Sequence, residues 1–181
     1  MKATGIVRRI DDLGRVVIPK EIRRTLRLRE GTPLEIFTDR EGEIILKKYS
    51  PMAELGSFAK QYADSLAQVS GHMVCITDRD QIIAVAGGKK EQLGKAISKQ
   101  LEQLILNRES VTAVREDKKY VSIIAGEAEE YTCQVIYPII CEGDAIGAVA
   151  LMGKDARIKM GEVEQKLAAA AAGFLGRQME S

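Results

Sequence analysis

The sequence predicts an α+β protein made of two domains. Residues 4–47 follow a strand-strand-helix-strand-strand order, and the remainder alternates helices with strands typical of a mainly antiparallel sheet. Ser50-Pro51 lies between these two patterns and forms a natural boundary. We therefore expect a small first domain at residues 1–50 and a larger second domain at residues 51–181.

The sequence of the first domain predicts two strands, one helix and two further strands, in that order. The expected elements are strands at 4–10 and 15–18, a helix at 20–28, and strands at 34–38 and 43–47. Pro19 favours the start of the helix, where a missing N–H costs nothing, and Gly31 follows its end. The segment holds too few apolar residues for a sound core of its own. We therefore expect this domain to fold only as an intertwined dimer.

The second domain reads as an antiparallel sheet with flanking helices. The expected helices are at 52–69, 91–106 and 161–179, and the expected strands are at 72–77, 81–86, 111–114, 120–124, 132–140 and 145–152. The stretch Cys141–Asp144 has the composition of a hairpin turn between the last two strands.

Positive charge is concentrated near the N-terminus. Residues 1–29 contain nine basic and three acidic residues, a net charge of +6, whereas the whole chain carries only +1. Such a division of charge favours a protein in which one part meets a polyanion and the other part does not.

One face of the predicted first helix is basic. Side chains that fall within about 100° of one another on a helical wheel are those of Lys20, Arg23, Arg24 and Arg27. Ile22 and Leu26 point the opposite way, toward the expected dimer core. Arginine contacts phosphate bidentately and reads the edge of guanine, so this face suits DNA. The alternative is an ordinary solvated helix face, which the shortage of acidic residues between Gly14 and Arg29 disfavours.

Residues 2–49 resemble, without a gap, the swapped-hairpin DNA-binding domain of AbrB-type transition-state regulators. The stretch GRVVIPKEIRRTL is highly specific for that family. The resemblance implies an interdigitated homodimer that binds double-stranded DNA. It places the DNA contacts on the arginines Arg8, Arg15, Arg23 and Arg24, with support from Lys2, Arg9, Lys20 and Arg27.

The attached second domain narrows the resemblance to transcription regulators of endospore-forming bacteria that control sporulation genes in the forespore. This implies a cytoplasmic protein that activates or represses transcription. The family also includes antitoxins, which usually carry a disordered acidic tail that wraps a toxin. Here a domain that reads as folded replaces that tail, which disfavours the antitoxin alternative.

The second domain resembles a GAF domain in its order of elements, although no specific ligand motif can be carried over. GAF domains sense varied small molecules, so the resemblance allows a small effector, but it gives neither the existence nor the identity of that effector, nor its binding residues. Amphipathic helices at 52–69 and 160–179, the second with a small-residue stripe at Ala168–Ala172, favour packing between chains into a homotetramer. The alternatives are that these helices only cover their own sheet, and that the protein is a ligand sensor whose first domain merely dimerises it.

No enzymatic activity, metal or cofactor is predicted. His72 is the only histidine, and Cys75, Cys133 and Cys141 form no CxxC pair, which disfavours a zinc site. Gly87-Gly88-Lys89-Lys90 lacks phosphate-loop spacing and reads as a turn. Asp78 and Asp80 also read as turn residues, and Tyr131, Tyr137 and Cys133 fit either a pocket or a core. Neither a membrane span nor a signal-peptide-like segment is expected.

Overall fold

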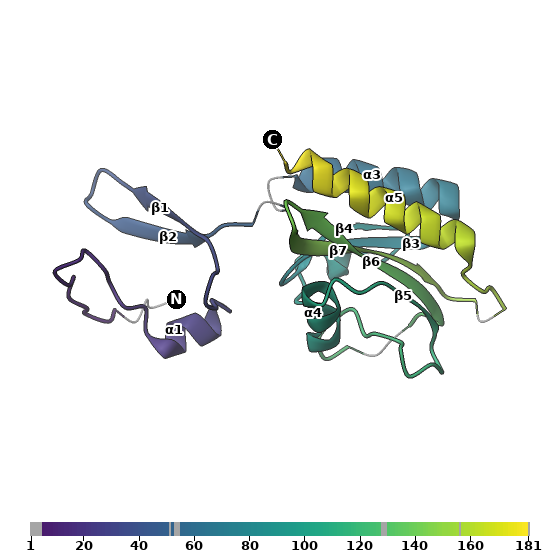
Figure 1. Cartoon of the computed structure of the whole chain (residues 1–181), viewed down its shortest axis with the longest axis horizontal. Coiled ribbons are helices and arrows are strands. Elements are labelled where there is room, and N and C mark those ends of the chain that lie inside the picture. Colours follow the sequence, from purple (N-terminus) through teal and green to yellow (C-terminus); the bar gives the residue numbers. More distant parts are fainter. Residues whose placement is uncertain (1–4, 51, 53–54, 128–129, 156, 181) are drawn as a thin grey trace. The chain divides into compact units, whose positions relative to one another are not determined.

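The computed structural model describes residues 5–50, 52, 55–127, 130–155 and 157–180. The chain divides into two compact units, Met1–Tyr49 and Ser50–Ser181. Each unit is described by itself below, with the labels of Figure 1. The α+β class expected from the sequence is confirmed by the two antiparallel sheets and their helices.

The first unit contains helix α1 (Lys20–Thr25) and a hairpin of strands β1 (Leu34–Thr38) and β2 (Ile44–Lys48). The Asp39 side chain closes the hairpin turn, because its Oδ1 accepts N–H bonds from Glu41 and Glu43. The strands expected at 4–10 and 15–18 are not regular strands in the described part of one chain. A strand needs a paired neighbour, and among the described residues this segment does not pair with the β1–β2 hairpin or with any other strand.

Almost nothing is buried in the first unit. Pro19 is the one buried residue among residues 5–49, and Val7 is 93% exposed. The other large apolar side chains exposed here are Ile6, Ile10, Leu13, Val16, Val17, Leu26, Ile36, Phe37, Ile44, Ile45 and Leu46. Residues 5–49 of a single copy therefore form no hydrophobic core.

The second unit is built on a five-stranded antiparallel sheet in the order β4-β3-β7-β6-β5. Its strands are β3 (Met73–Asp78), β4 (Ile82–Ala86), β5 (Val111–Val114), β6 (Cys133–Cys141) and β7 (Asp144–Gly153). The loop between β6 and β7 has two residues, Glu142 and Gly143, both with positive φ, as a tight hairpin requires. The hairpin turn expected at 141–144 is confirmed.

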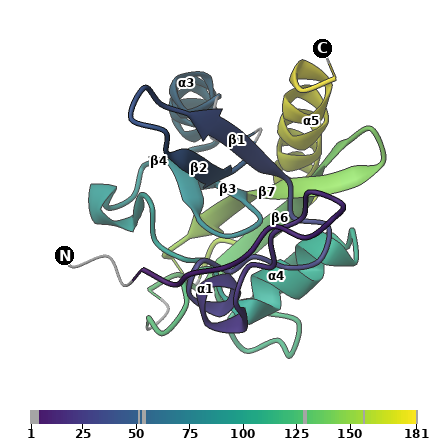
Figure 2. The same cartoon turned by 90° about the vertical axis from the view of Figure 1, so that its left-hand side faces the viewer.

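Helices cover both faces of this sheet. Figures 1 and 2 show α3 (Gly56–Ser70) and α5 (Glu162–Gln178) side by side on one face and α4 (Lys99–Leu106) on the other. The stripe expected to allow close packing between chains is used inside the chain, because Ala168, Ala171 and Ala172 are buried in the core beneath α3 and α5. Small side chains there let α5 lie close to its own sheet.

Two elements of the second unit differ from the expectation. The helix expected at 91–106 is a short 3-10 turn, η1 (Lys90–Gln92), followed by α4. Gly94 adopts φ +77° between them, and the chain then runs extended to Ser98, whose hydroxyl caps α4 by accepting the Leu101 N–H. The strand expected at 120–124 is wrong as well, since only Ile124 pairs there, in a single bridge to Ile97.

Helix α5 approaches the sheet so closely that it requires glycine at one position. A Cβ added to Gly176 would lie 2.0 Å from the carbonyl oxygen of Ile140 on β6. At Gly173, three residues earlier on the same helix, the nearest atom to an added Cβ is the tip of Arg177 at 3.9 Å.

Gly176→Ala is expected to lower the free energy of unfolding by about 3 kcal/mol, because the methyl group collides with a backbone that cannot move aside. Gly173→Ala is the matched control and should raise that free energy by about 0.5–1 kcal/mol, through higher helix propensity. Urea unfolding of both full-length variants measures the difference. Equal effects would show that α5 does not press on β6 as described.

Candidate nucleic-acid interface

The basic residues expected to contact DNA lie on the surface of the first unit. All that the structure describes are exposed: Arg8, Arg9, Arg15, Lys20, Arg23, Arg24 and Arg27. Lys2 lies outside the described residues. Lys20, Arg23 and Arg24 project from α1, whereas the other four flank the Asp11–Gly14 turn or follow the helix.

An aspartate holds one of these arginines in place. Oδ1 of Asp11 accepts the backbone N–H groups of Leu13 at 3.0 Å and Arg15 at 2.8 Å, and Oδ2 accepts Nε–H of Arg15 at 2.8 Å. The backbone N–H of Arg15, followed by its guanidinium, lowers the pKa of Asp11, so the carboxylate stays charged. The side chain of Arg15 remains 69% exposed, so the turn orients this guanidinium without covering it.

Helix α1 is shorter than the helix expected at residues 20–28. It stops at Thr25, and the chain reverses through Arg27, which has φ +53°. The N–H groups of Arg27 and Leu28 bond back to the carbonyls of Arg24 and Arg23, at 3.3 and 2.7 Å, which is a Schellman closure. The direction of Arg27 is thus set by this reversal and not by the helical repeat. Most proteins place glycine at such a position.

Few acidic groups neutralise this surface. Among the described residues 5–49, the pair between Arg15 and Asp11 is the one ion pair that involves a basic residue predicted to contact DNA. The positive charge is therefore available to an external anion. The anchoring role of Asp11 and the reversal at Arg27 were missed from sequence. The Asp-Asp-Leu-Gly turn composition was a signal for the first, but a non-glycine residue at Arg27 gave none for the second.

None of the described cysteines has the lowered pKa of an activated thiol. Cys75 and Cys133 are buried in strands, and burial raises the pKa of Cys75 to about 12. Burial raises the pKa of Cys133 and of the partly exposed Cys141 as well. Across the described residues, no group of three or more His, Cys, Asp or Glu side chains is arranged to hold a metal. Asp78 is buried and closes the β3–β4 turn by accepting the N–H groups of Asp80 and Gln81, as expected for a turn residue.

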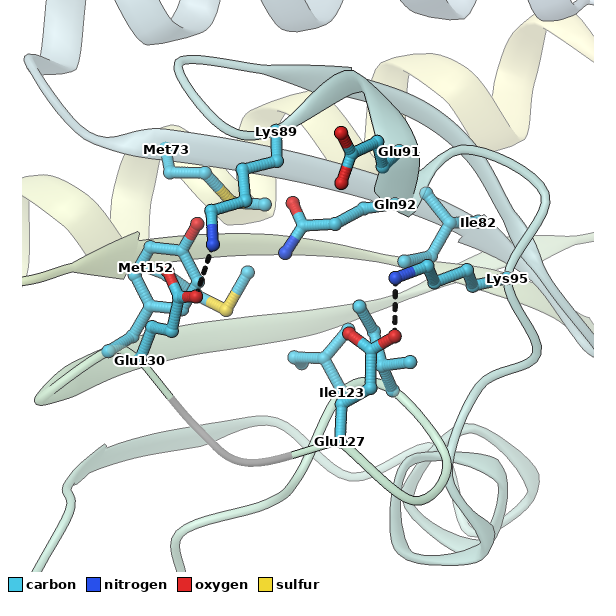
Figure 3. A pocket seen from close by; sticks show the side chains of 12 residues that line it. Met73, Ile82, Lys89, Glu91, Gln92, Lys95, Ile123, Glu127, Glu130 and Met152 are labelled. Carbon is cyan, nitrogen blue, oxygen red and sulfur yellow. Dashed lines mark hydrogen bonds and ion pairs between the residues drawn. The ribbon is translucent and has the colours of Figure 1, made fainter.

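A cavity of about 110 Å³ lies on the α4 side of the second sheet. Figure 3 shows Lys89, Gln92 and Lys95 on one side of it and Glu127 and Glu130 on the other. Tyr131 lines this cavity, whereas Tyr137 and Cys133 belong to the core on the opposite, α3–α5 face. The sequence alone did not decide whether these three residues line a pocket or lie in the core.

Comparison with known proteins covers both units. A family model described as "Stage V sporulation protein T C-terminal, transcription factor" matches residues 54–180, and one described as "Antidote-toxin recognition MazE, bacterial antitoxin" matches residues 7–54. Stage V sporulation protein T of Bacillus subtilis is 60% identical over 181 residues, covering 99% of both chains. The transition state regulatory protein AbrB of the same organism is 42% identical over 58% of this chain and 97% of its own.

Solved structures identify the fold of the second unit. The GAF domain of an Acinetobacter phosphoenolpyruvate-protein phosphotransferase superposes with a TM-score of 0.58, at 12% identity over 74% of this chain and 84% of that domain. The cofactor-binding GAF domain of the nutrient sensor CodY from Clostridium difficile superposes with a TM-score of 0.51. It is 15% identical, and the match covers 66% of this chain and 83% of that domain. None of the described helices is long and apolar enough to cross a membrane. The chain belongs to the stage V sporulation protein T family, sporulation transcription factors in which an AbrB-like DNA-binding domain precedes a GAF-like domain.

Proposed function

We propose that the protein controls sporulation genes by binding double-stranded DNA through a dimer of its first unit, residues 1–50. The DNA contacts are assigned to Arg8, Arg15, Arg23 and Arg24, supported by Lys2, Arg9, Lys20 and Arg27. The observation that carries this proposal is an exposed, largely unneutralised basic surface on a unit that has no core of its own.

The hairpin of the first unit supports dimerisation because both of its faces are apolar. Ile36 lies opposite Leu46 on one face, and Phe37 lies opposite Ile45 on the other face. All four side chains are at least 45% exposed in a single chain. A two-stranded sheet of this kind is marginal in water, and a second copy of the chain can cover both faces.

Dimerisation also improves the DNA-binding surface. Two copies double the number of arginines and favour two half-sites related by symmetry on the duplex. Contacts to phosphate make the affinity strongly dependent on salt, and contacts to base edges supply specificity. Asp11 holds Arg15 just after the first turn, which reduces the ordering cost when that arginine meets DNA.

The second unit, residues 51–181, is assigned to sensing and assembly. The cavity beside α4 supports binding of a small effector. On the other face of the sheet, Val69 of α3 and Val163 of α5 are 76% and 67% exposed, which supports contact between chains and assembly into a tetramer. The site of action is assigned to the cytoplasm of the forespore.

Replacing Arg23 and Arg24 together with Ala is expected to weaken DNA binding at least tenfold at physiological salt and to leave the dimer intact. A dimer loses four arginines, so the slope of log affinity against log salt should flatten by about 3–4 if all four contact phosphate. Fluorescence anisotropy with genomic fragments and an unrelated duplex measures both quantities.

Lys118→Ala/Lys119→Ala provides the matched control, because it removes the same charge from an exposed loop of the second unit. Equal losses in the two double variants would mean that only net charge matters. Unchanged binding after the arginine replacement would favour a ligand sensor whose first unit serves only to dimerise it.

Arg27→Gly is expected to raise the free energy of unfolding by up to about 1 kcal/mol, since glycine adopts φ +53° without steric cost. The same variant should bind DNA several-fold more weakly, because the dimer loses two guanidinium groups. Arg27→Ala separates the two effects, since it removes the charge and keeps the strained backbone. Thermal unfolding and anisotropy give the comparison, and a glycine variant no more stable than the alanine variant contradicts the strain argument.

Ile36→Glu is expected to disrupt the dimer, because it sets a carboxylate opposite Leu46 in the apolar layer assigned to the partner chain. Glu41→Gln, at the exposed hairpin tip, should change nothing. Sedimentation equilibrium reports the assembly of both variants and of the parent protein. An unaffected Ile36→Glu dimer would remove the hairpin from the interface, and a parent protein found only as dimers would contradict the tetramer.

A further inference from the structure

The cavity beside α4 has an apolar interior formed by two strands and a loop. Met73 on β3 and Met152 on β7 are direct neighbours across the sheet and lie together at its floor, as Figure 3 shows. Ile82 at the start of β4 and Ile123 in the loop after Tyr120 complete the apolar wall. Flexible methionine side chains adapt to the shape of an aliphatic group.

The mouth of the cavity is charged with both signs. Lys89 pairs with Glu130, and Lys95 pairs with Glu127, so each ion pair bridges the two loops that border the opening. These carboxylates and ammonium groups are partly exposed, and Glu91 adds a further negative charge. Two lysines and three glutamates thus surround the opening. Exposed pairs of this kind contribute little to stability, so they can exchange partners with a charged ligand at low cost.

Two polar atoms inside the cavity make no hydrogen bond of normal geometry in the described structure, and the side chains that carry them lie close enough to interact with each other. These atoms are Oη of Tyr131, a residue only 4% exposed, and Oε1 of Gln92. The Tyr131 ring is held in place, since Lys154 lies over it at 5.4 Å and the Tyr120 hydroxyl donates to its backbone carbonyl at 3.1 Å. Burial also raises the pKa of Tyr131, so the phenol stays protonated and can donate. A hydroxyl without a well-formed hydrogen bond in a fixed, buried position is costly and suits an absent ligand.

We propose that this cavity binds a free α-amino acid with an aliphatic or thioether side chain. Its ammonium group meets Glu127 or Glu130 and the Gln92 oxygen, its carboxylate meets Lys89 or Lys95 and the Tyr131 hydroxyl, and its side chain lies between Met73 and Met152. The inference rests on the proposed sensing role of the second unit and specifies the chemical class of its effector.

Size and charge disfavour the other classes of effector. A cavity of about 110 Å³ is below the roughly 300–1,000 Å³ of pockets that enclose drug-sized ligands, so nucleotides and haem are too large. Lys154 also pairs with Glu130, so three carboxylates face three ammonium groups, and the opening has no excess positive charge to attract phosphates and other polyanions. A neutral hydrocarbon would leave Tyr131 and Gln92 without a well-formed hydrogen bond. A small zwitterion with an apolar tail satisfies all three conditions.

The test is isothermal titration calorimetry of the full-length protein without DNA. The probes are L-leucine and L-methionine, together with isopentylamine and 4-methylpentanoate, which each keep one charged group of leucine, and cyclic AMP. Saturable binding of an amino acid, at least tenfold tighter than either single-charge analogue, is the expected result. Absence of binding by both amino acids, or equal binding of an analogue or of cyclic AMP, would overturn the proposal.

Tyr131→Phe gives the sharper measurement, because its two expected effects have opposite signs. Removing a hydroxyl that lacks a well-formed hydrogen bond should raise the Tm of the ligand-free protein by about 2–4 °C, while the affinity for the amino acid should fall at least tenfold. Tyr137→Phe removes the same atom from a side chain on the other face of the sheet and should leave the affinity unchanged. Equal affinity in the Tyr131 variant and the parent would overturn the assignment of this hydroxyl.

The outcome is separable from that of the DNA-binding proposal. Calorimetry measures the second unit's ligand in the absence of DNA, and anisotropy measures DNA binding in the absence of ligand. Loss of DNA binding in Arg23→Ala/Arg24→Ala with amino-acid binding retained would confirm that different residues form the two sites. Failure of the amino-acid titration with intact DNA binding would overturn this inference alone.

Discussion

The first unit exposes more apolar surface than a single chain can keep in water, and this constraint governs the rest of the molecule. Ile36, Phe37, Ile45 and Leu46 occupy both faces of a two-stranded hairpin, and Val7 and Val17 are exposed in the preceding segment. A protein cannot bury such residues without a second layer on each side. In the proposed dimer, folding of this unit and pairing of two chains are a single event, so its stability is expected to depend on protein concentration.

The same constraint explains why the arginines lie where they do. In the proposed dimer, the apolar groups of this segment face the partner chain, and the polar positions left over face solvent. Arg8, Arg15, Arg23 and Arg24 take those positions, and few carboxylates accompany them. Asp11 is an exception that serves the surface, because its charge fixes Arg15 and the turn together. Arg27 has a backbone conformation that glycine prefers, and the DNA contact proposed for its guanidinium would account for the arginine there.

Local patterns predicted most elements, and they failed where partners far apart in the sequence decide the structure. The strands of the second sheet begin and end close to their expected limits, because alternation and the Glu142-Gly143 turn are local signals. The helix expected at 91–106 was too long, since Gly94 and the bridge of Ile97 to Ile124 favour an extended chain there. The strands expected at 4–10 and 15–18 have no ladder within the described residues of one chain, and we propose that the second chain of the dimer supplies it.

The basic residues predicted to contact DNA show the same difference between what local sequence predicts and what other residues decide. Exposure of the described residues agrees with their polar positions in the sequence, but the geometry at Arg15 and Arg27 comes from Asp11 and from the end of α1. The alternation of side chains along β6 does not predict which face of the sheet Tyr131 occupies, because Tyr131 precedes the strand. Its position is fixed instead by contacts with Lys154 and Tyr120. Its neighbour Cys133, which lies within β6, follows the alternation of the strand into the opposite core.

The two faces of the second sheet provide a physical route between a ligand and assembly. Met73 and Met152 face the cavity, while the next residues along the same strands, Val74 and Leu151, face the core beneath α3 and α5. A close-packed sheet cannot move one face without the other, and the contact of Gly176 with β6 leaves α5 little room to adjust. A ligand that binds one arrangement of these helices more tightly would therefore shift any assembly made through them. Because the proposed DNA-binding surface is formed by two chains, a change in assembly would alter DNA affinity without any contact between ligand and DNA.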